Sequence, residues 1–431
     1  MNDPFEAARD GVASAEVETV EVAIVGGGLV GLTLAIALAE QGIEVAVVDQ
    51  EDPAAQRQMP YDGRSTAIAL GTRRVLETTG VWASIASQAQ PIDDIRVSDG
   101  PSRLFLHYDH RDVATAEGAE PFGHIVENRV IREALHARAA KLGSLRWLAP
   151  MRLGPLPGAI ERSAGGVRLA LANGRIVEST LLIGADGAES AVRADAGIGT
   201  VQHDYGQSAI VCTVTHERPH ENVAHERFLP AGPFALLPMT PGPDHPHRSS
   251  LVWTERRGAV PALMALDDSA FGMEMERRFG PFLGKLRPEG GRWTYPLVMV
   301  LAERLTAPRL ALVGDAAHRI HPLAGQGLNL GIRDLAALAE AIVDARRIGL
   351  DLGSQPVLDR YARWRRFDTL LMAGAMHGLN RLFSNDVLPL RLARDLGIAA
   401  VDRMGPLKRL FMRHAMGTVG QLPRLIRGAA L

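Results

Sequence analysis

Three glycines and one acid near the start of the sequence have the types and spacing of a nucleotide-binding turn. Gly26, Gly28 and Gly31 form the pattern G-x-G-x-x-G between a strand-like run and a helical run. Such glycines permit a tight turn, the approach of a pyrophosphate and close packing of helix on strand, while free N–H groups at the start of the helix attract phosphate. Asp49 ends the next strand-like run, where an acid accepts hydrogen bonds from a ribose. The pattern predicts a dinucleotide site and leaves FAD and NAD open.

Two later segments repeat the order of apolar strand followed by acid. The run 181–185 precedes Asp186, and the run 310–314 precedes Asp315. Residues 321–331 then form a second glycine-rich segment, and from Leu328 onward apolar residues recur at helical spacing. This loop again presents the positive end of a helix to a ligand.

In these three motifs the sequence resembles the FAD-dependent aromatic hydroxylases, which are single-component flavoprotein monooxygenases. The resemblance implies FAD as the cofactor, with Asp315 at the ribityl chain and the loop 324–329 facing the isoalloxazine. It implies that Asp186 serves both the flavin and a pyridine nucleotide, that Arg64 reaches the pyrophosphate or ribityl region, and that Asn128 is a polar flavin contact. Alternatively, Arg64 is a surface residue and Asn128 a helix cap. The implied cofactor-binding residues are Gly26, Gly28, Gly31, Asp49, Arg64, Asn128, Asp186, Asp315, Gly325, Gly327, Leu328 and Asn329.

Further motifs narrow the resemblance to the hydroxylases of ubiquinone biosynthesis. They include the segments 62–70, 205–207 and 224–228, and the similarity continues to about residue 420. It implies that the protein hydroxylates the aromatic ring of a polyprenylated phenol through a flavin C4a-hydroperoxide. O2 is then the co-substrate, NAD(P)H or another electron donor the reductant, and other quinone-biosynthesis proteins are partners. Two alternatives stay open, a hydroxylase of a soluble aromatic acid and a non-catalytic FAD-binding scaffold of a quinone-biosynthesis complex.

The sequence does not identify the base that would activate a phenol. The catalytic residues are likewise unknown, because the resemblance implies that the flavin carries the chemistry; the candidates for a catalytic role in the loop beside it are His321, Pro322, Gly325, Gln326 and Gly327. His318 and His321 flank the loop, and each either acts as a base or hydrogen-bonds locally and shapes the loop; we favour the second interpretation. Backbone N–H groups of 325–329 are expected to stabilise the anionic reduced flavin.

The composition excludes several classes of protein and of metal site. Forty-seven Lys and Arg against 49 Asp and Glu give a formal charge of −2, unlike the basic excess of a dedicated nucleic-acid binder. Cys212 is the only cysteine, so neither a disulfide within the chain nor a multi-cysteine metal site can form; we expect it to be a core residue. His216 and His220 match the zinc motif H-E-x-x-H, but Pro219 breaks the helix that this motif requires. No metal site is predicted.

The C-terminal stretch differs from the rest of the chain in charge. From residue 387 onward eight Lys and Arg stand against two Asp, a net of +6, and leucines recur at helical spacing. Either a basic amphipathic helix lies on an anionic membrane surface, or a helical cap packs on the flavin domain. The run 22–39 carries no charge, but glycines interrupt it, so a strand, a turn and a helix are expected there. We therefore expect a cytoplasmic protein, with peripheral contact to the inner face of the membrane if the basic helix binds lipid.

The predicted fold class is α/β, with a Rossmann-like FAD-binding domain, an inserted mixed β-sheet domain on the substrate side and a C-terminal helical region. The FAD-binding domain is expected at 20–90, 123–200 and 301–370, and the substrate-side sheet at 91–122 and 201–300. The helical region is expected at 371–431. Residues 1–19 are expected to be a disordered leader.

Overall fold

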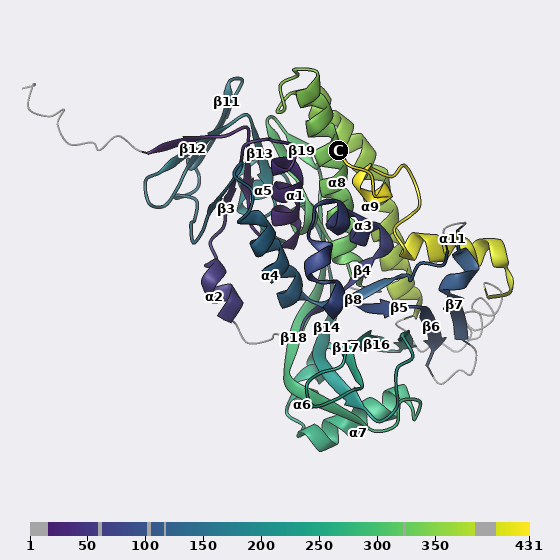
Figure 1. Cartoon of the computed structure of the whole chain (residues 1–431). Coiled ribbons are helices and arrows are strands. Elements are labelled where there is room, and N and C mark those ends of the chain that lie inside the picture. The colour runs from purple at the N-terminus through teal and green to yellow at the C-terminus, as the bar shows by residue number, and fades with distance from the viewer. Residues whose placement is uncertain (1–15, 59–62, 101–104, 116–117, 322–324, 384–401) are drawn as a thin grey trace, which may run out of the picture.

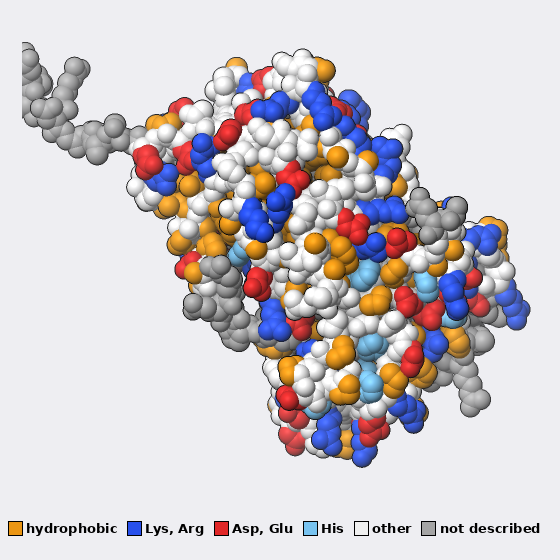
Figure 2. Space-filling model, viewed as in Figure 1, with side chains coloured by type: hydrophobic (Ala, Val, Ile, Leu, Met, Phe, Trp, Pro, Cys, Tyr) orange, Lys and Arg blue, Asp and Glu red, His pale blue; other side chains and the backbone are white. Residues whose placement is uncertain are grey.

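The computed structural model describes residues 16–58, 63–100, 105–115, 118–321, 325–383 and 402–431 of the 431-residue chain. Pro322 and the part of the basic stretch at 387–401 lie outside these residues. The described strands form four sheets, which helices cover (Figure 1). Acidic and basic side chains are interspersed over the face in Figure 2, as the near-balanced composition leads one to expect.

A largely parallel sheet forms the nucleotide-binding part of the fold. Its strands, in spatial order, are β19 (Thr306–Ala307), β20 (Leu310–Leu312), β13 (Leu181–Gly184), β2 (Val22–Val25), β3 (Val45–Val48) and β9 (Leu145–Leu148), and only β19 runs antiparallel to its neighbour. Val22 and Ile24 belong to one buried cluster, whereas Ala23 and Val25 belong to another. A parallel sheet that is buried on both faces is typical of Rossmann-like folds, so the predicted fold class is confirmed.

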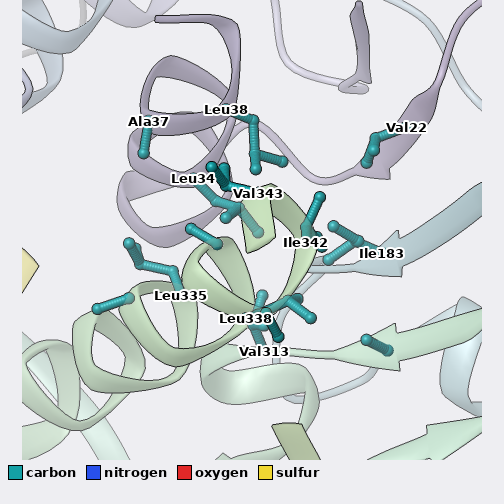
Figure 3. Close-up of a cluster of buried hydrophobic side chains, with 14 of the residues drawn as sticks. Val22, Leu34, Ala37, Leu38, Ile183, Val313, Leu335, Leu338, Ile342 and Val343 are labelled. Carbon is teal, nitrogen blue, oxygen red and sulfur yellow. The ribbon is translucent and has the colours of Figure 1, made fainter. Parts of the chain in front are cut away.

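Helices α1 (Leu29–Ala39) and α8 (Gln326–Arg347) cover one face of this sheet. Leu34 and Leu38 of α1 pack with Leu335 and Ile342 of α8 beside Ile183 of β13 (Figure 3). The uncharged run 22–39 is therefore strand β2, the glycine turn and α1, as predicted. The first half of the chain has four further helices, α2 (Pro53–Gln58), α3 (Leu70–Thr78), α4 (Asn128–Ala139) and α5 (Ala191–Asp195).

A second, smaller sheet covers the other face of the parallel sheet. Its strands are β1 (Val17–Thr19), β12 (Ile176–Ser179), β11 (Gly166–Ala170) and β10 (Ile160–Ser163). The disordered leader predicted for 1–19 is wrong for residues 17–19, because they pair in parallel with β12 and form the edge strand of this sheet. Glu18 also forms ion pairs with Arg146 and Arg175 at 2.9 and 3.1 Å.

An eight-stranded mixed sheet forms the second large part of the fold. In spatial order it contains β21 (His318–Arg319), β18 (Leu286–Ala302), β14 (Thr200–His216), β17 (Arg248–Arg256), β16 (Gly232–Met239), β15 (Val223–Leu229), β6 (Asp94–Asp99) and β7 (Phe105–Asp109). Except for β21, these strands come from the segments predicted for this sheet, with strand ends at residues 200 and 302. Its outer face packs on α6 (Val260–Met264) and α7 (Asp268–Phe279), and there Cys212 is a buried core residue, as expected.

A three-stranded sheet joins the two parts, and a long helix follows α8. The small sheet contains β4 (Ser65–Ala69), β8 (Gly123–Glu127) and β5 (Gln90–Ile92). The domain boundary predicted after residue 370 falls inside α9 (Gln355–Phe383), because buried residues at helical spacing continue through Thr369 and Ala373. The described C-terminal part contains α11 (Gly405–Ala415). Among the described residues, no helix is both long and apolar enough to cross a membrane.

Candidate functional site

The glycine turn between β2 and α1 combines two crowded glycines with one that faces open space. Gly26 has a φ of 106°, and a Cβ there would lie 2.3 Å from the carbonyl oxygen of Ala185. A Cβ on Gly31 would lie 2.0 Å from the carbonyl oxygen of Gly26. At Gly28, the N-cap of α1, a Cβ would meet nothing within 4 Å. The fold therefore requires Gly26 and Gly31, and it leaves the space beside Gly28 for a ligand.

The three acid motifs converge at one edge of the parallel sheet. Val25, which precedes the glycine turn, pairs with Gly184, which in turn pairs with Leu312. Because parallel strands end at the same edge, Asp186 and Asp315 follow their strands beside the turn. Val30 of α1 lies against Gly314, so the third motif contacts the first helix directly.

Two of these acids differ in how much of their carboxylate the protein already binds. Asp49 accepts hydrogen bonds from the backbone N–H groups of Gly27 and Glu51. Burial raises the pKa of Asp49, although these two N–H groups oppose the shift. Oδ2 of Asp186 accepts a hydrogen bond from the N–H of Val192 at 3.1 Å, but its buried Oδ1 has no partner among the described residues. Asp186 therefore keeps a free acceptor beside the glycine turn.

Asp315 lies in a short 3-10 turn, Gly314–Ala316, on the wall of a cavity. The Asp315 carboxylate is accessible from the cavity, yet the surrounding protein desolvates it. This desolvation raises the pKa of Asp315, and the charges of His318 and Arg319 oppose the rise only in part. A carboxylate in this position can accept hydrogen bonds from the hydroxyl groups of a polyol chain.

The glycine-rich loop before α8 divides its residues between the cavity and the protein. Gly325 is left-handed, with a φ of 63°, and together with Gly327 and Leu328 it lines the cavity. Asn329 is buried instead, where its Oδ1 accepts hydrogen bonds from Ala69 N–H and Thr72 Oγ1 and its Nδ2 donates to Ala67 O, at 2.8–3.0 Å. Asn329 therefore fixes the loop against β4 and α3, and the residues before it present the start of α8 to the cavity.

Gln326 is turned away from the cavity that Gly325 and Gly327 line. Its side chain borders a separate recess between α8, α9 and the C-terminal segment, together with Met372 and His414.

Arg64 and Asn128 are held side by side by the β4–β8 pairing. The N–H of Asn128 donates to Arg64 O at 3.0 Å, and Thr66 Oγ1 donates to Asn128 Oδ1 at 2.6 Å. Arg64 lines the cavity, and its guanidinium lies 5.7 Å from the centre of the Tyr295 ring. Asn128 is the first residue of α4, whose N-cap is Glu127, so it is not a helix cap. It also does not border the cavity.

The structure separates His318 from His321. Nε2 of His318 lies 2.5 Å from Oδ2 of the buried Asp334, which can only accept, so His318 serves the local structure. His321 lines the cavity, and both of its buried ring nitrogens lack a hydrogen-bond partner among the described residues. Burial lowers the pKa of His321 to about 4, so its imidazole is neutral near pH 7 and can accept a proton.

The cavity lies between the loop before α8 and the eight-stranded sheet, and its volume of about 360 Å³ is within the range of small-molecule sites. One wall includes the polar residues Arg64, Asp315, Arg319 and His321, and His225, Glu226 and Thr254 add polar groups on the opposite strands. The apolar wall consists of Ile92, Ile95, Ala209, Val211, Ala224, Ala235, Leu237, Val252, Leu297 and Val298. The arrangement can hold a polar, planar group against one wall and an apolar ring against the other.

Sequence reasoning missed several residues around this cavity. Tyr295 and Glu226 line it, and the ring of Tyr205 lies edge-on to that of His321, with centres 4.9 Å apart. The motif at 205–207 had drawn attention to Tyr205, but only the folded sheet brings it to His321. Glu226 belongs to the motif at 224–228, which did not single it out, and Tyr295 lies on a strand without a local signal for ligand binding.

The two histidines of the H-E-x-x-H match are bound to the protein instead of a metal. Nδ1 of His216 lies 2.6 Å from Arg218 O, and its Nε2 lies 3.0 Å from Ser249 Oγ. Nε2 of His220 lies 3.1 Å from Met239 O. His216 ends strand β14, so the helix that a zinc protease needs is not formed. No group of three or more potential metal ligands occurs in the described part of the chain.

Comparison with known proteins agrees with this geometry. Residues 19–367 match the family described as FAD binding domain. The sequence is 53% identical over 432 residues to the ubiquinone hydroxylase UbiL of Rhodospirillum rubrum, and the match covers 100% of this chain and 97% of that protein. It is 35% identical over 403 residues to the 3-demethoxyubiquinol 3-hydroxylase of Escherichia coli, which covers 93% of this chain and 99% of that protein.

A solved structure shares the fold at low sequence identity. The p-nitrophenol 4-monooxygenase PnpA from Pseudomonas putida superimposes with a TM-score of 0.77 at 19% identity, covering 94% of this chain and 99% of that one. This likeness is evidence for the fold alone.

Proposed function

The chain belongs to the FAD-binding-domain family, and we propose that it is a flavin-dependent monooxygenase that hydroxylates the aromatic ring of a polyprenylated phenol in ubiquinone biosynthesis. FAD is the cofactor, O2 the co-substrate and NAD(P)H the reductant. The similarity to a ubiquinone hydroxylase and to a 3-demethoxyubiquinol 3-hydroxylase, over nearly the whole of each chain, supports this substrate class.

The observation that carries the proposal is the cavity with one polar and one apolar wall. The open space beside Gly28 fits a pyrophosphate, and the free Oδ1 of Asp186 and the carboxylate of Asp315 fit hydroxyl donors of the same ligand. The apolar wall supports an aromatic substrate with an apolar substituent over a soluble acid. Asp49, Arg64 and Asn128 complete the proposed FAD site.

When bound, FAD supplies the reduction of O2 and the transfer of one oxygen atom to the ring. The protein contributes binding, orientation and the exclusion of water. We propose that the N–H groups of Gly325, Gly327 and Leu328 at the start of α8 stabilise negative charge on the isoalloxazine. The apolar wall positions the phenol and keeps bulk water from the reacting atoms.

We further propose that His321 accepts a hydrogen bond from the phenolic hydroxyl group and orients the ring. It is a buried imidazole on the cavity wall, and neither of its ring nitrogens has a partner in the described structure. His321→Gln is expected to lower kcat about fivefold, because the flexible glutamine side chain loses the orienting hydrogen bond, which contributes about 1 kcal/mol, and to leave the FAD content unchanged. With a pKa of about 4, His321 stays neutral from pH 8 to pH 5, so it causes no loss of activity in that range.

Stopped-flow measurement of hydroxylation across pH tests this role. His203→Gln is the matched control, because His203 contacts Tyr205 from outside the cavity. An unchanged kcat in the His321 variant would mean that this histidine only shapes the loop.

We also propose that the protein is cytoplasmic, meets the inner face of the membrane through its C-terminal region, and works with other quinone-biosynthesis proteins. The net charge of +6 from residue 387 onward supports contact with anionic lipid. Exposed Arg403, Arg409 and Arg413 are the described residues of that stretch with the clearest access to a surface.

Deletion of the gene followed by lipid analysis tests the function as a whole. The deleted strain is expected to accumulate a prenylated quinone precursor that lacks a ring hydroxyl group, and the intact gene to restore ubiquinone. An unchanged ubiquinone profile would refute the function. Complementation with the FAD-depleted variant Gly28→Val separates the enzyme from a scaffold, since only a scaffold would work without flavin.

A further inference from the structure

Helix α9 carries large apolar side chains on its solvent face. Phe367 is 74% exposed, Leu370 55% and Leu371 49%, and Leu379 and Leu382 are exposed further along the helix. At 3.6 residues per turn, Phe367, Leu371 and Leu382 lie within about 60° of one another around the helix axis, and Leu370 and Leu379 border them on either side. We call these five residues the α9 stripe. A row of this size on the surface marks an interaction site more often than an isolated apolar residue does.

Positive charge accompanies the stripe without negative charge to balance it. Arg363 lies about one turn before Phe367 and Arg366 directly precedes it; both are exposed and form no ion pair with any described residue. The one acid between residues 363 and 382 is Asp368, which is bound to Arg365 and Arg333 on the inner side of the helix. The solvent face of α9 is therefore both apolar and basic.

The inner face of α9 packs beside the cavity. Met372 and Met376 lie against Ile320 and Leu330, which flank the loop that lines the cavity. Met376 and Phe383 also contact the cluster of Leu106 and Phe228 on the eight-stranded sheet. The helix that carries the stripe is thus one layer of side chains away from the site.

Helix α11 also carries exposed apolar side chains, and its inner side touches the apolar wall. Its Met412 and the following Met416 pack in one cluster with Ile92, Ile95 and Leu237, which all belong to the apolar wall. On its outer side Leu410 and Phe411 are 45% and 44% exposed. Figure 2 shows Lys and Arg side chains at the edge of the molecule where α11 lies in Figure 1.

We propose that the α9 stripe, together with Leu410 and Phe411, rests on an anionic lipid surface, and that the polyprenyl chain of the substrate passes from the lipid to the cavity under α9 and α11. This inference rests on the proposed substrate class. Apolar side chains enter the boundary between headgroups and acyl chains, while flanking arginines pair with anionic headgroups. The apolar contacts beneath both helices continue to the apolar wall, where the aromatic ring of the substrate binds.

The charges favour lipid over a second copy of the chain as the occupant. Two stripes that paired across a two-fold axis would bring the arginines of both copies into one apolar interface. Because the stripe has no exposed acid beside it, these charges would remain unpaired, at a cost in stability. An anionic lipid surface supplies the missing negative charge.

Co-sedimentation of the FAD-loaded, full-length protein with vesicles tests the proposal. The vesicles contain phosphatidylcholine with or without phosphatidylglycerol. Two double variants are each expected to weaken binding to the anionic vesicles about tenfold or more. They are Phe367→Ser with Leu371→Ser, and Arg363→Glu with Arg366→Glu. For the second variant, each basic residue near such a surface contributes about fivefold. The controls Ile348→Ser with Met273→Ser, and Arg287→Glu, remove equally exposed groups elsewhere and should bind like the wild type.

Hydroxylation assays separate this proposal from the proposed function. The stripe variants should keep wild-type activity on a phenol with one isoprene unit in solution and lose activity on a long-chain phenol in vesicles. Equal vesicle binding by all variants overturns the lipid surface. Sedimentation velocity tests the second outcome that would contradict the proposal. In that outcome the wild type is a dimer, the stripe variants are monomers, and vesicle binding is the same for all of them. If the wild type fails on the short phenol, the proposed function fails, and vesicle binding still decides the role of the stripe.

Discussion

Gly28→Val is expected to abolish FAD binding while the protein stays folded, whereas Gly26→Ala should lose both FAD and stability. The backbone of Gly28 is extended, so valine fits its conformation, and its side chain points into the space where a pyrophosphate would lie. At Gly26 an added Cβ meets the Ala185 carbonyl at 2.3 Å in a left-handed backbone. Strain and overlap together should cost about 3 kcal/mol of unfolding free energy.

Two measurements on the purified variants distinguish these outcomes. Flavin absorbance per protein reports cofactor content, and urea unfolding of the cofactor-free forms reports stability. Gly143→Val is the matched control, since Gly143 also has open space around its Cβ but lies far from the glycine turn in the loop before β9. A yellow Gly28→Val protein would show that the open space is not the cofactor's place.

Local sequence was sufficient to predict which segments meet at the edge of the parallel sheet where we propose that FAD binds. The glycine turn and the acids 186 and 315 each lie where a strand ends, and parallel strands bring their ends to one edge whatever the rest of the chain does. The α/β fold class follows from the same pattern. The proximity of these segments could therefore be expected before their contacts were known.

The substrate side depends on contacts between distant segments and was less predictable. Tyr295 of β18 meets Arg64 of β4, and Tyr205 meets His321, more than 100 residues apart. The hydrogen-bond partners also distinguish the two histidines. Asp334 binds His318, whereas the ring nitrogens of His321 have no partner among the described residues, and no local sequence pattern predicts this difference.

The remaining differences have similar causes. Residues 17–19 form a strand because β12 offers an edge, although their own sequence is polar. Helical spacing predicts which residues of α9 share a face, but it does not say that Phe367 and Leu371 face solvent. Whether a residue of α9 is exposed depends on which other segments of the folded chain pack against that side of the helix.

Asp334→Ala is expected to destabilise the protein by about 4 kcal/mol and to lower its FAD content. Asp334 is fully buried, and it accepts hydrogen bonds from Gly314 N–H at 3.1 Å, His318 Nε2 at 2.5 Å and Arg365 Nε at 2.8 Å. Removing one partner of a buried ion pair costs about 3–5 kcal/mol, because the other charge stays buried without compensation. Gly314 also loses its anchor, and Asp315 follows it directly at the cofactor site. As a control, Asp204→Ala removes the exposed pair with Arg257 and should leave the stability nearly unchanged, because water screens this pair.

The pH dependence of the stability difference identifies the buried carboxylate as its source. Burial by itself raises the pKa of Asp334, but His318 and Arg365 outweigh it, so the pKa lies below its ordinary value. A carboxyl group with a lowered pKa contributes its full stability above the pKa of the unfolded chain, about 3.9, and loses it as the pH falls through the folded value. The difference between wild type and Asp334→Ala in urea unfolding should therefore be constant from pH 7 to pH 5 and shrink below about pH 4. A difference that is independent of pH down to pH 3 would assign the loss to packing, because an uncharged contact does not titrate.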